Sequence, residues 1–249
     1  MKIREIQVKT ILSRSQIYEY ALNPYVGCSH ACTYCYARFM KRFSGHTEKW
    51  GEFVDVKINA PDLLRKEIKK KRPGRVWISG VCDPYQPIEK RYELTRRCLE
   101  ILIEVGWPVT IQTKSPLVLR DIDLLEKSEE IEVGFTITTA DETMRRLFEP
   151  FAPPIEKRID ALAILHSQRV KTFAMIAPIL PGSEGLIERL TGTVDYVIID
   201  RMNYHYSDWV YKKYKIEDAL SDNFFIQTAR KLKEGFERQG IPCEVLFRY

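Results

Sequence analysis

The sequence lacks long apolar runs, low-complexity segments and a large charge of one sign. No stretch approaches the roughly 18 apolar residues of a membrane helix, and the opening MKIREIQVKT lacks the apolar core of a signal peptide. The basic and acidic side chains give a formal net charge of 39 − 34 = +5. That excess is compatible with a polyanionic partner and also with ordinary solubility. We therefore expect a cytoplasmic protein with no membrane segment.

The six cysteines are not spread along the chain as in a secreted disulfide framework. Cys28, Cys32 and Cys35 fall within eight residues, whereas Cys82, Cys98 and Cys243 are scattered. In a reducing compartment, such clustering favours metal or redox chemistry over disulfides.

From residue 75 onward, short β-branched runs alternate with amphipathic helical stretches. We predict strands over 17–27, 75–80, 108–114, 131–139, 170–179 and 194–200. The helices predicted between and after them span 60–71, 93–105, 119–127, 141–149, 153–168, 184–190 and 222–239, and a last strand-like stretch covers 243–247. Strands that alternate with helices imply a parallel sheet with right-handed crossovers. Six repeats favour an α/β fold of the partial (β/α)6, TIM-like barrel type.

No linker divides the sequence, so we expect a single domain over 1–249, with a core of about 17–204 and a C-terminal helical extension over 205–249. In such folds the chemistry gathers where the parallel strands end. The cysteine cluster and Cys82 both fall at strand ends, together with residues 113–115, 138–141, 177–181 and 200–204.

The spacing C-x3-C-x2-C can give one thiolate to each of three irons in a cubane cluster. Electron-transfer clusters take four cysteines, so three leave one iron open, as a catalytic metal requires. Three other interpretations compete, and the weakest is that these are buried structural cysteines, which would not bunch in a loop rich in Gly, His and Tyr. A zinc site could use Cys28, His30, Cys32 and Cys35, although one-residue spacings strain a tetrahedral site. A redox dithiol at Cys32 and Cys35 would leave Cys28 unexplained.

The pattern C-x3-C-x-aromatic-C, with Tyr34 as the aromatic, resembles the radical S-adenosylmethionine (SAM) superfamily. The strings NPYVGCSHACTYCYAR, DPYQPIEKRYELTRRCLEIL, IQTKSPLVLRDIDLL and EPFAPPIEKRIDAL look like its spore photoproduct lyase-related, DNA repair photolyase-like branch. The resemblance runs from about Ile17 to Tyr204. It implies a fold of the radical SAM type, a 4Fe–4S cluster on the three cysteines, and SAM chelated at the open iron.

The same resemblance implies the reaction and its partners. Reductive cleavage of SAM gives methionine and a deoxyadenosyl radical that abstracts hydrogen from a substrate, which by analogy is DNA or RNA. The electron donor is expected to be of the ferredoxin or flavodoxin type. The same chemistry on a peptide, protein or small metabolite is one alternative. A zinc-stabilised nucleic-acid-binding module without catalysis is another.

The resemblance also assigns SAM-binding residues. It places Tyr34 against the adenine with Tyr36 in the same cavity, Ser79 and Gly80 at the amino group, and Lys114 at the carboxylate. It gives the ribose or methionine end to Thr138 and Thr139, and adenine contact to the strand around Ile176. Each assignment has a structural alternative, such as core packing, a strand-end turn or a solvated lysine. Further candidate contacts with substrate or SAM lie in the loop after the second strand: Asp83, Tyr85, Gln86 and Glu89.

Spore photoproduct lyases carry a hydrogen-donating cysteine at the end of the second strand. Here that position falls on Gly80, and Cys82 lies two residues further on. Cys82 is therefore a candidate hydrogen donor, with a passive cysteine as the alternative.

Two basic segments are candidates for binding nucleic acid. Arg65–Arg75 lies at a helix end and before a strand, so we expect a solvated face away from the site. After the sixth strand, basic and aromatic residues interleave over 201–215. That pattern suits base stacking with phosphate neutralisation. It also suits an amphipathic helix with inward aromatics, which we favour.

Overall fold

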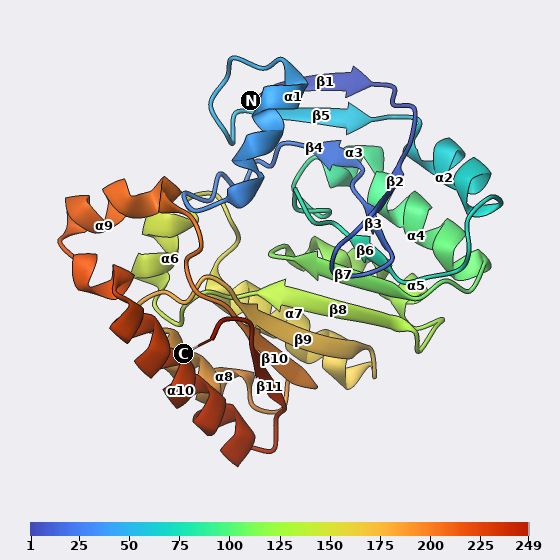
Figure 1. Ribbon diagram of the computed structural model, residues 1–249. Coiled ribbons are helices and arrows are strands. Elements are labelled where there is room, and N and C mark those ends of the chain that lie inside the picture. Colours follow the sequence, from blue (N-terminus) through green and yellow to red (C-terminus); the bar gives the residue numbers. More distant parts are fainter. Residues whose placement is uncertain (249) are drawn as a thin grey trace. The chain divides into compact units, whose positions relative to one another are not determined.

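The computed structural model describes residues 1–248. The chain forms two compact units (Figure 1). The N-terminal unit consists of Met1–Ala31 and Ala37–Val133, and the C-terminal unit consists of Cys32–Tyr36 and the chain from Gly134 onward.

The N-terminal unit contains a small sheet in the order β1 (Lys2–Ile6), β5 (Phe53–Lys57) and β4 (Tyr25–Val26). β1 is parallel to β5, and β4 is antiparallel to it. The buried side chains of Phe53, Val54 and Val56 hold β5 in the core of this unit.

The same unit contains β2 (Leu12–Arg14), β3 (Tyr20–Leu22), β6 (Val76–Ile78) and β7 (Val109–Thr113) as neighbours in that order. β3, β6 and β7 are parallel, and β2 is antiparallel to β3. The helices of this unit are α1 (Lys41–Ser44), α2 (Ala60–Ile68), α3 (Glu89–Tyr92), α4 (Leu94–Glu104) and α5 (Ile122–Leu125). α4 buries Leu94, Cys98 and Ile101 along one face, and burial of each leucine or isoleucine side chain contributes about 1.5–3 kcal/mol.

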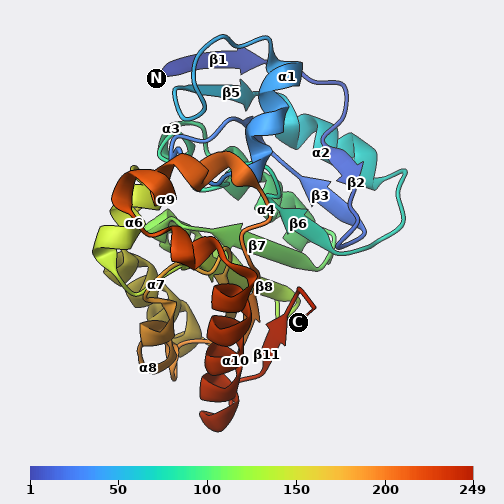
Figure 2. The same cartoon turned by 60° about the vertical axis from the view of Figure 1, so that its left-hand side comes forward.

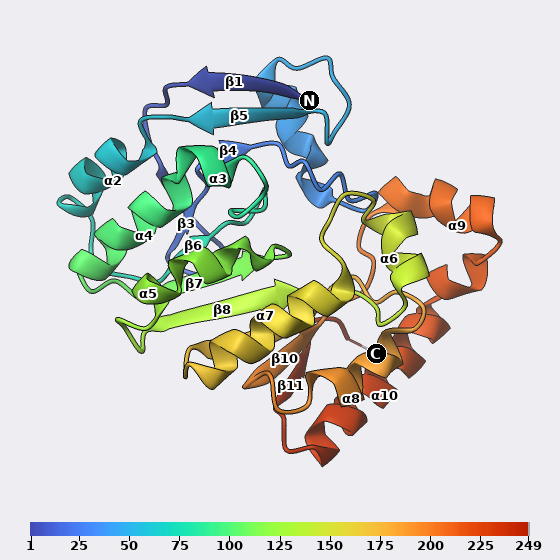
Figure 3. The same ribbon diagram turned by 180° about the vertical axis from the view of Figure 1, so that it is seen from behind.

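The C-terminal unit contains the parallel strands β9 (Lys171–Ile176), β10 (Tyr196–Ile199) and β11 (Cys243–Val245). Its helices are α6 (Glu142–Phe148), α7 (Ile155–Ser167), α8 (Leu186–Leu190), α9 (Asp208–Tyr214) and α10 (Asp222–Arg238). α10 packs along β11 (Figure 2), and α7, which Figure 3 shows from behind, packs on β9. β8 (Ile131–Thr136) is buried over its whole length and contributes residues to both units.

Local chemistry explains several boundaries. α6 begins after Asp141, whose carboxylate accepts hydrogen bonds from the backbone N–H groups of Thr143 and Met144. In β8, a side chain at Gly134 would place its Cβ 2.0 Å from the Phe173 ring. A glycine is therefore required where the aromatic ring lies directly on the strand.

Most predicted elements are present; one prediction is wrong and another is confirmed only in part. The single strand expected over 17–27 is divided into β3 and β4 around Asn23 and Pro24, and β4 pairs in the small sheet. The helix expected over 119–127 is a 3-10 turn at Pro116–Asp121 followed by the one-turn helix α5. The small sheet itself was not predicted.

Over residues 1–248, none of the helices combines the length and apolar character needed to cross a lipid bilayer.

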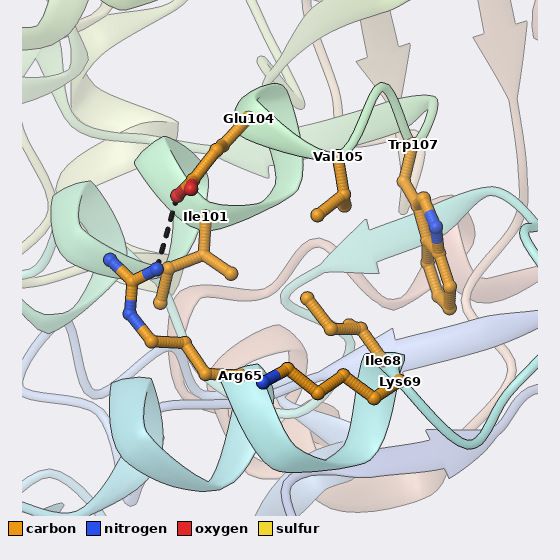
Figure 4. A pocket seen from close by; sticks show the side chains of 7 residues that line it. All are labelled: Arg65, Ile68, Lys69, Ile101, Glu104, Val105 and Trp107. Atoms are coloured by element: carbon orange, nitrogen blue, oxygen red, sulfur yellow. Dashed lines mark hydrogen bonds and ion pairs between the residues drawn. The ribbon is translucent and has the colours of Figure 1, made fainter.

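The basic run Arg65–Arg75 lies at the end of α2 and before β6, as predicted. Arg65 pairs with Glu104 of α4 at 3.0 Å. Beside this pair a surface pocket of about 300 Å³ is lined by Arg65, Ile68, Lys69, Ile101, Glu104, Val105 and Trp107 (Figure 4). The lining holds one exposed ion pair, the Lys69 side chain and apolar side chains, with no thiol, hydroxyl or imidazole among them, so we assign no chemistry to it.

Candidate functional site

The first half of the cysteine loop is fastened inside the N-terminal unit. The backbone N–H of Ala31 donates to the carbonyl of Cys28 at 3.3 Å, which closes a turn with Cys28 at its first position. The Gln86 side chain holds this turn at two points. Its Oε1 accepts from the Ser29 N–H at 3.0 Å, and its Nε2 donates to the Gly27 carbonyl at 3.1 Å.

The loop also approaches its surroundings too closely for larger residues. Gly27 has a φ of 87°, and a Cβ there would lie 2.4 Å from the Phe53 carbonyl oxygen. A Cβ on Gly51 would lie 2.3 Å from the Cβ of Ala31, which itself has a positive φ. The conformation of the first turn is thus set by close backbone packing.

The second half of the loop belongs to the C-terminal unit. The N–H of Cys35 donates to the carbonyl of Cys32 at 3.2 Å, and the N–H of Thr33 donates to the Phe148 carbonyl at 2.8 Å. The Tyr34 hydroxyl donates to Glu149. Desolvation, followed by the neighbouring Glu149 charge, raises the pKa of Tyr34 well above its ordinary value. The phenol therefore stays protonated and acts as the donor.

Glu149 is the centre of a buried network in the same unit. It is ion-paired with Arg158 at 2.6 Å, and both side chains are 0% exposed. The Thr138 hydroxyl donates to the same carboxylate at 3.3 Å. Burial acts to lower the pKa of Arg158, but the neighbouring Glu149 carboxylate and other charges outweigh it, so the pKa is raised.

The three cysteine side chains are chemically suited to bind three irons of a cluster. Cys28 and Cys32 are less than a tenth exposed, Cys35 is half-buried, and two of the three begin a turn. Among residues 1–248, no three His, Cys, Asp or Glu side chains are already grouped as metal ligands. The thiolates as cluster ligands therefore remain a prediction. His30, a zinc ligand in the alternative interpretation, lies with Nδ1 3.4 Å from Asp83 Oδ2.

Asp83 joins the ends of two strands in the N-terminal unit. Its Oδ1 accepts from the Thr113 hydroxyl at 2.6 Å and the Tyr85 N–H at 2.9 Å. Its Oδ2 accepts from the backbone N–H of Lys114 at 2.7 Å. Asp83 thus fixes the backbone that carries the Lys114 side chain, and its expected contact with SAM stays a prediction.

Ser79 and Cys82 form a second small group at the end of β6. The Ser79 hydroxyl donates to Asn23 Oδ1 at 2.6 Å and lies 3.0 Å from the Cys82 sulfur. Gly80 follows Ser79, and a Cβ there would lie 3.1 Å from the Trp77 ring. Asn23 also accepts from the Val81 N–H at 3.1 Å, so it shapes this turn.

The predicted loop contacts Tyr85, Gln86 and Glu89 are fully buried. Glu89 accepts hydrogen bonds from the Tyr25 hydroxyl and from the N–H groups that open α4, and it pairs with Arg120 at 2.9 Å. The polar groups of Gln86 and Glu89 thus support the chain from within, and the interpretation of the three residues as contacts with substrate or SAM stays a prediction.

In the C-terminal unit, Thr138 and Thr139 follow β8 and Ile176 ends β9. All three are at most 1% exposed. The Thr139 hydroxyl donates to the Pro181 carbonyl at 2.6 Å. The hydroxyl groups of Thr138 and Thr139 therefore both donate to partners within the chain. A ligand could still bind to the lone pairs of these hydroxyl oxygens or to the backbone groups of the two residues.

An aromatic surface follows the second half of the loop. The rings of Tyr36 and Tyr204 stack at 6.2 Å and 18°, and those of Tyr204 and Tyr206 stack at 5.8 Å and 9°. These three rings, with Trp209, are 38–54% exposed, whereas Tyr211 is buried. The favoured expectation of inward-facing aromatics is therefore wrong except for Tyr211. The exposure of Tyr204 and Tyr206 was not predictable, because α9 begins at Asp208 and its helical period does not extend over them.

Sequence reasoning assigned no role to Glu149, Arg158 or Asn23. A signal existed for Arg158, since it shares the buried face of α7 with Ile155 and Leu162. A charge on an apolar helix face requires a buried partner.

Comparison with known proteins identifies the relatives of this chain. The model of the radical SAM superfamily matches residues 22–184. An uncharacterized protein of Methanocaldococcus jannaschii is 44% identical over 184 residues, which cover 73% of this chain and 69% of that protein. Other relatives are longer, and the matched part spans 56% or 50% of their length.

Among solved structures, a spore photoproduct lyase complexed with dinucleoside spore photoproduct has a TM-score of 0.71 at 16% identity, over 98% of this chain and 82% of that one. Streptococcus suis SuiB bound to precursor peptide SuiA has a TM-score of 0.60 at 17% identity, over 92% and 48%. These likenesses confirm the predicted fold class, an α/β fold of the partial (β/α)6, radical SAM type.

Proposed function

The chain belongs to the radical SAM superfamily, and from that premise we propose that it is an enzyme whose Cys28, Cys32 and Cys35 hold a 4Fe–4S cluster. When bound, the cluster and SAM supply a one-electron cleavage that gives methionine and a hydrogen-abstracting deoxyadenosyl radical. The observation that carries the proposal is the loop, in which Cys28 and Cys32 each begin a turn fastened by side-chain or backbone hydrogen bonds. A cytoplasmic location would keep the thiols reduced, and a ferredoxin- or flavodoxin-type donor would supply the electron.

The chain's own residues would bind and orient SAM. The Tyr34 ring is assigned to the adenine with Tyr36 beside it, the turn at Ser79 and Gly80 to the amino group, and the Lys114 ammonium to the carboxylate. Asp83 holds the backbone beneath Lys114. Thr138, Thr139 and Ile176 are assigned to the ribose and adenine through backbone groups or hydroxyl oxygens, since the hydroxyl protons have partners.

The proposal is tested by anaerobic reconstitution with iron and sulfide, followed by SAM and dithionite, with deoxyadenosine as the product measured. Alanine at Cys28, Cys32 or Cys35 should abolish deoxyadenosine and lower bound iron. Cys243→Ala, which changes a half-buried thiol in β11, should leave both unchanged. Colourless protein with one zinc per chain would instead support the non-catalytic module.

For the substrate we propose a nucleic-acid base or lesion. The support is the exposed stack of Tyr204 and Tyr206 beside Tyr36, the residue that follows Cys35. Stacking on an aromatic ring contributes about 1–3 kcal/mol per base. Three exposed lysines at the end of α9, Lys212, Lys213 and Lys215, would attract phosphates. The lyase with a similar fold is complexed with a dinucleoside photoproduct.

Fluorescence anisotropy with single-stranded oligonucleotides at two salt concentrations tests this substrate. Binding should weaken at higher salt, and the double variant Tyr204→Ala, Tyr206→Ala should weaken it at least tenfold. The control is Phe43→Ala, since Phe43 is 78% exposed and lies in the N-terminal unit. The rival is the same chemistry on a peptide or small metabolite, because the fold is also similar to that of SuiB with its precursor peptide. Absence of salt-dependent oligonucleotide binding would favour the rival.

A further inference from the structure

Glu149 and Arg158 form an ion pair inside the C-terminal unit, and no step proposed above uses it. Glu149 follows α6, and Arg158 lies on the buried face of α7. The two side chains meet at 2.6 Å with 0% exposure on both sides.

The guanidinium of Arg158 is held on every side. Its Nε donates to the Pro153 carbonyl at 2.9 Å, and its Nη1 donates to the Thr136 carbonyl at 3.0 Å. With the carboxylate at Nη2, the arginine has one geometry available to it. A buried pair of this kind is often no more stabilising than apolar side chains of similar volume, so its best-attested use is to specify one arrangement.

The ion pair is connected to the cysteine loop through the side chain of Tyr34. Glu149 Oε1 accepts the hydrogen bond of the Tyr34 hydroxyl, while Oε2 faces Arg158. The preceding residue, Thr33, donates its N–H to the Phe148 carbonyl at 2.8 Å. The segment between Cys32 and Cys35 is thus fastened to the end of α6 at two consecutive residues.

We propose that Glu149 and Arg158 are positioning residues that fix the Tyr34 ring, and through it the affinity of the site for the adenine of SAM. This role rests on the proposed function, because it needs a site that binds SAM. Arg158 orients the carboxylate, the carboxylate orients the phenol, and the ring presents one fixed face to the ligand.

A double-mutant cycle on SAM affinity tests this role. The variants are Tyr34→Phe, Glu149→Gln and the double variant, each reconstituted and measured for SAM dissociation constant, bound iron and thermal midpoint. Each single change should raise the dissociation constant about five- to tenfold, and the double change should add less than about twofold to the larger single effect. Bound iron should stay at the wild-type level.

The matched control is Glu142→Gln, which removes the same charge from a carboxylate that pairs with Arg145 in α6. It should leave SAM affinity unchanged even if it lowers the thermal midpoint. Tyr34→Phe keeps the ring and tests the same hydrogen bond if Glu149→Gln does not fold. Two results would overturn this role alone. One is wild-type SAM affinity in Tyr34→Phe, and the other is a dissociation constant in the double variant that rises by the product of the two single effects. Wild-type protein that holds no iron or does not bind SAM would overturn the proposed function and the role together.

Discussion

At the scale of single residues, the surroundings of Cys82 decide which chemistry its thiol can perform. The sulfur lies 3.0 Å from the Ser79 hydroxyl and 3.5 Å from the Tyr25 carbonyl. Burial raises the pKa of Cys82 to about 11, against the lowering effect of the Ser79 hydrogen bond. At neutral pH the proton therefore stays on sulfur. A neutral thiol suits the donation of a hydrogen atom, whereas nucleophilic attack needs the thiolate.

Cys82→Ala should leave SAM cleavage to deoxyadenosine within about twofold of wild type and should abolish turnover of the true substrate.

Alkylation by iodoacetamide at pH 8 gives an independent measurement. The thiolate fraction at that pH makes Cys82 react on the order of 100-fold more slowly than an unperturbed cysteine. Mass spectrometry of the peptide that contains Cys82 measures the rate. Rapid alkylation at pH 8 would contradict a protonated thiol.

At the scale of elements, the segment that runs from Asp83 into α4 acts as a support for the site. Asp83 holds the end of β7, Gln86 holds the first turn of the cysteine loop, and Glu89 receives the first N–H groups of α4. Burial raises the pKa of Glu89, while its hydrogen bonds to Tyr25 and Arg120 oppose that shift. One short segment therefore positions three separate elements of the N-terminal unit.

Gln86→Ala should reduce iron bound after reconstitution by at least half, because it leaves the Ser29 N–H and the Gly27 carbonyl without their side-chain partner. Two lost hydrogen bonds of this kind also cost about 1–3 kcal/mol in the free energy of unfolding. Iron analysis and urea denaturation measure the two effects. Gln227→Ala, on the exposed face of α10, is the control, and equal iron in both variants would refute the support role.

The periodic elements were predictable from the sequence, and the supporting contacts were not. α4, α6 and α7 have apolar spacing, an acidic cap or an early proline that mark them locally. β4 and β5 are short, and the 26 residues of 27–52 separate them along the chain, so no local pattern reveals their pairing. Gln86 and Glu89 were interpreted as ligand contacts because loops at the functional ends of strands usually carry specificity. Only tertiary packing shows that they point inward.

At the scale of the whole molecule, both units keep ionisable groups in their interiors. Burial raises the pKa of Cys243 to about 12 and that of Cys98 still further. The pKa of Tyr25 and Tyr85 is also raised, in both cases mainly by desolvation. Each of these groups is neutral when folded at a pH where it ionises once unfolded.

The free energy of unfolding should therefore fall as the pH rises into the alkaline range. Above the ordinary thiol pKa of about 8.5, the unfolded chain loses protons that the folded chain keeps, so the free energy of unfolding falls by about 1.4 kcal/mol per pH unit for each fully buried thiol. Below that pH both states keep their protons, so the thiols do not lower the free energy of unfolding. Urea denaturation between pH 7.5 and 10, under reducing conditions, measures the slope, and Cys98→Ala should make it shallower. A stability that is constant over this range would disprove the prediction.

The interior ion pair of Glu149 and Arg158 also constrains how this chain can diverge. Loss of one partner leaves an uncompensated charge in the core, at about 3–5 kcal/mol, whereas exchange of both for apolar side chains is often neutral. Descendants of this sequence should therefore keep both residues or replace both. A census of natural variants at positions 149 and 158 should find paired changes and few solitary ones.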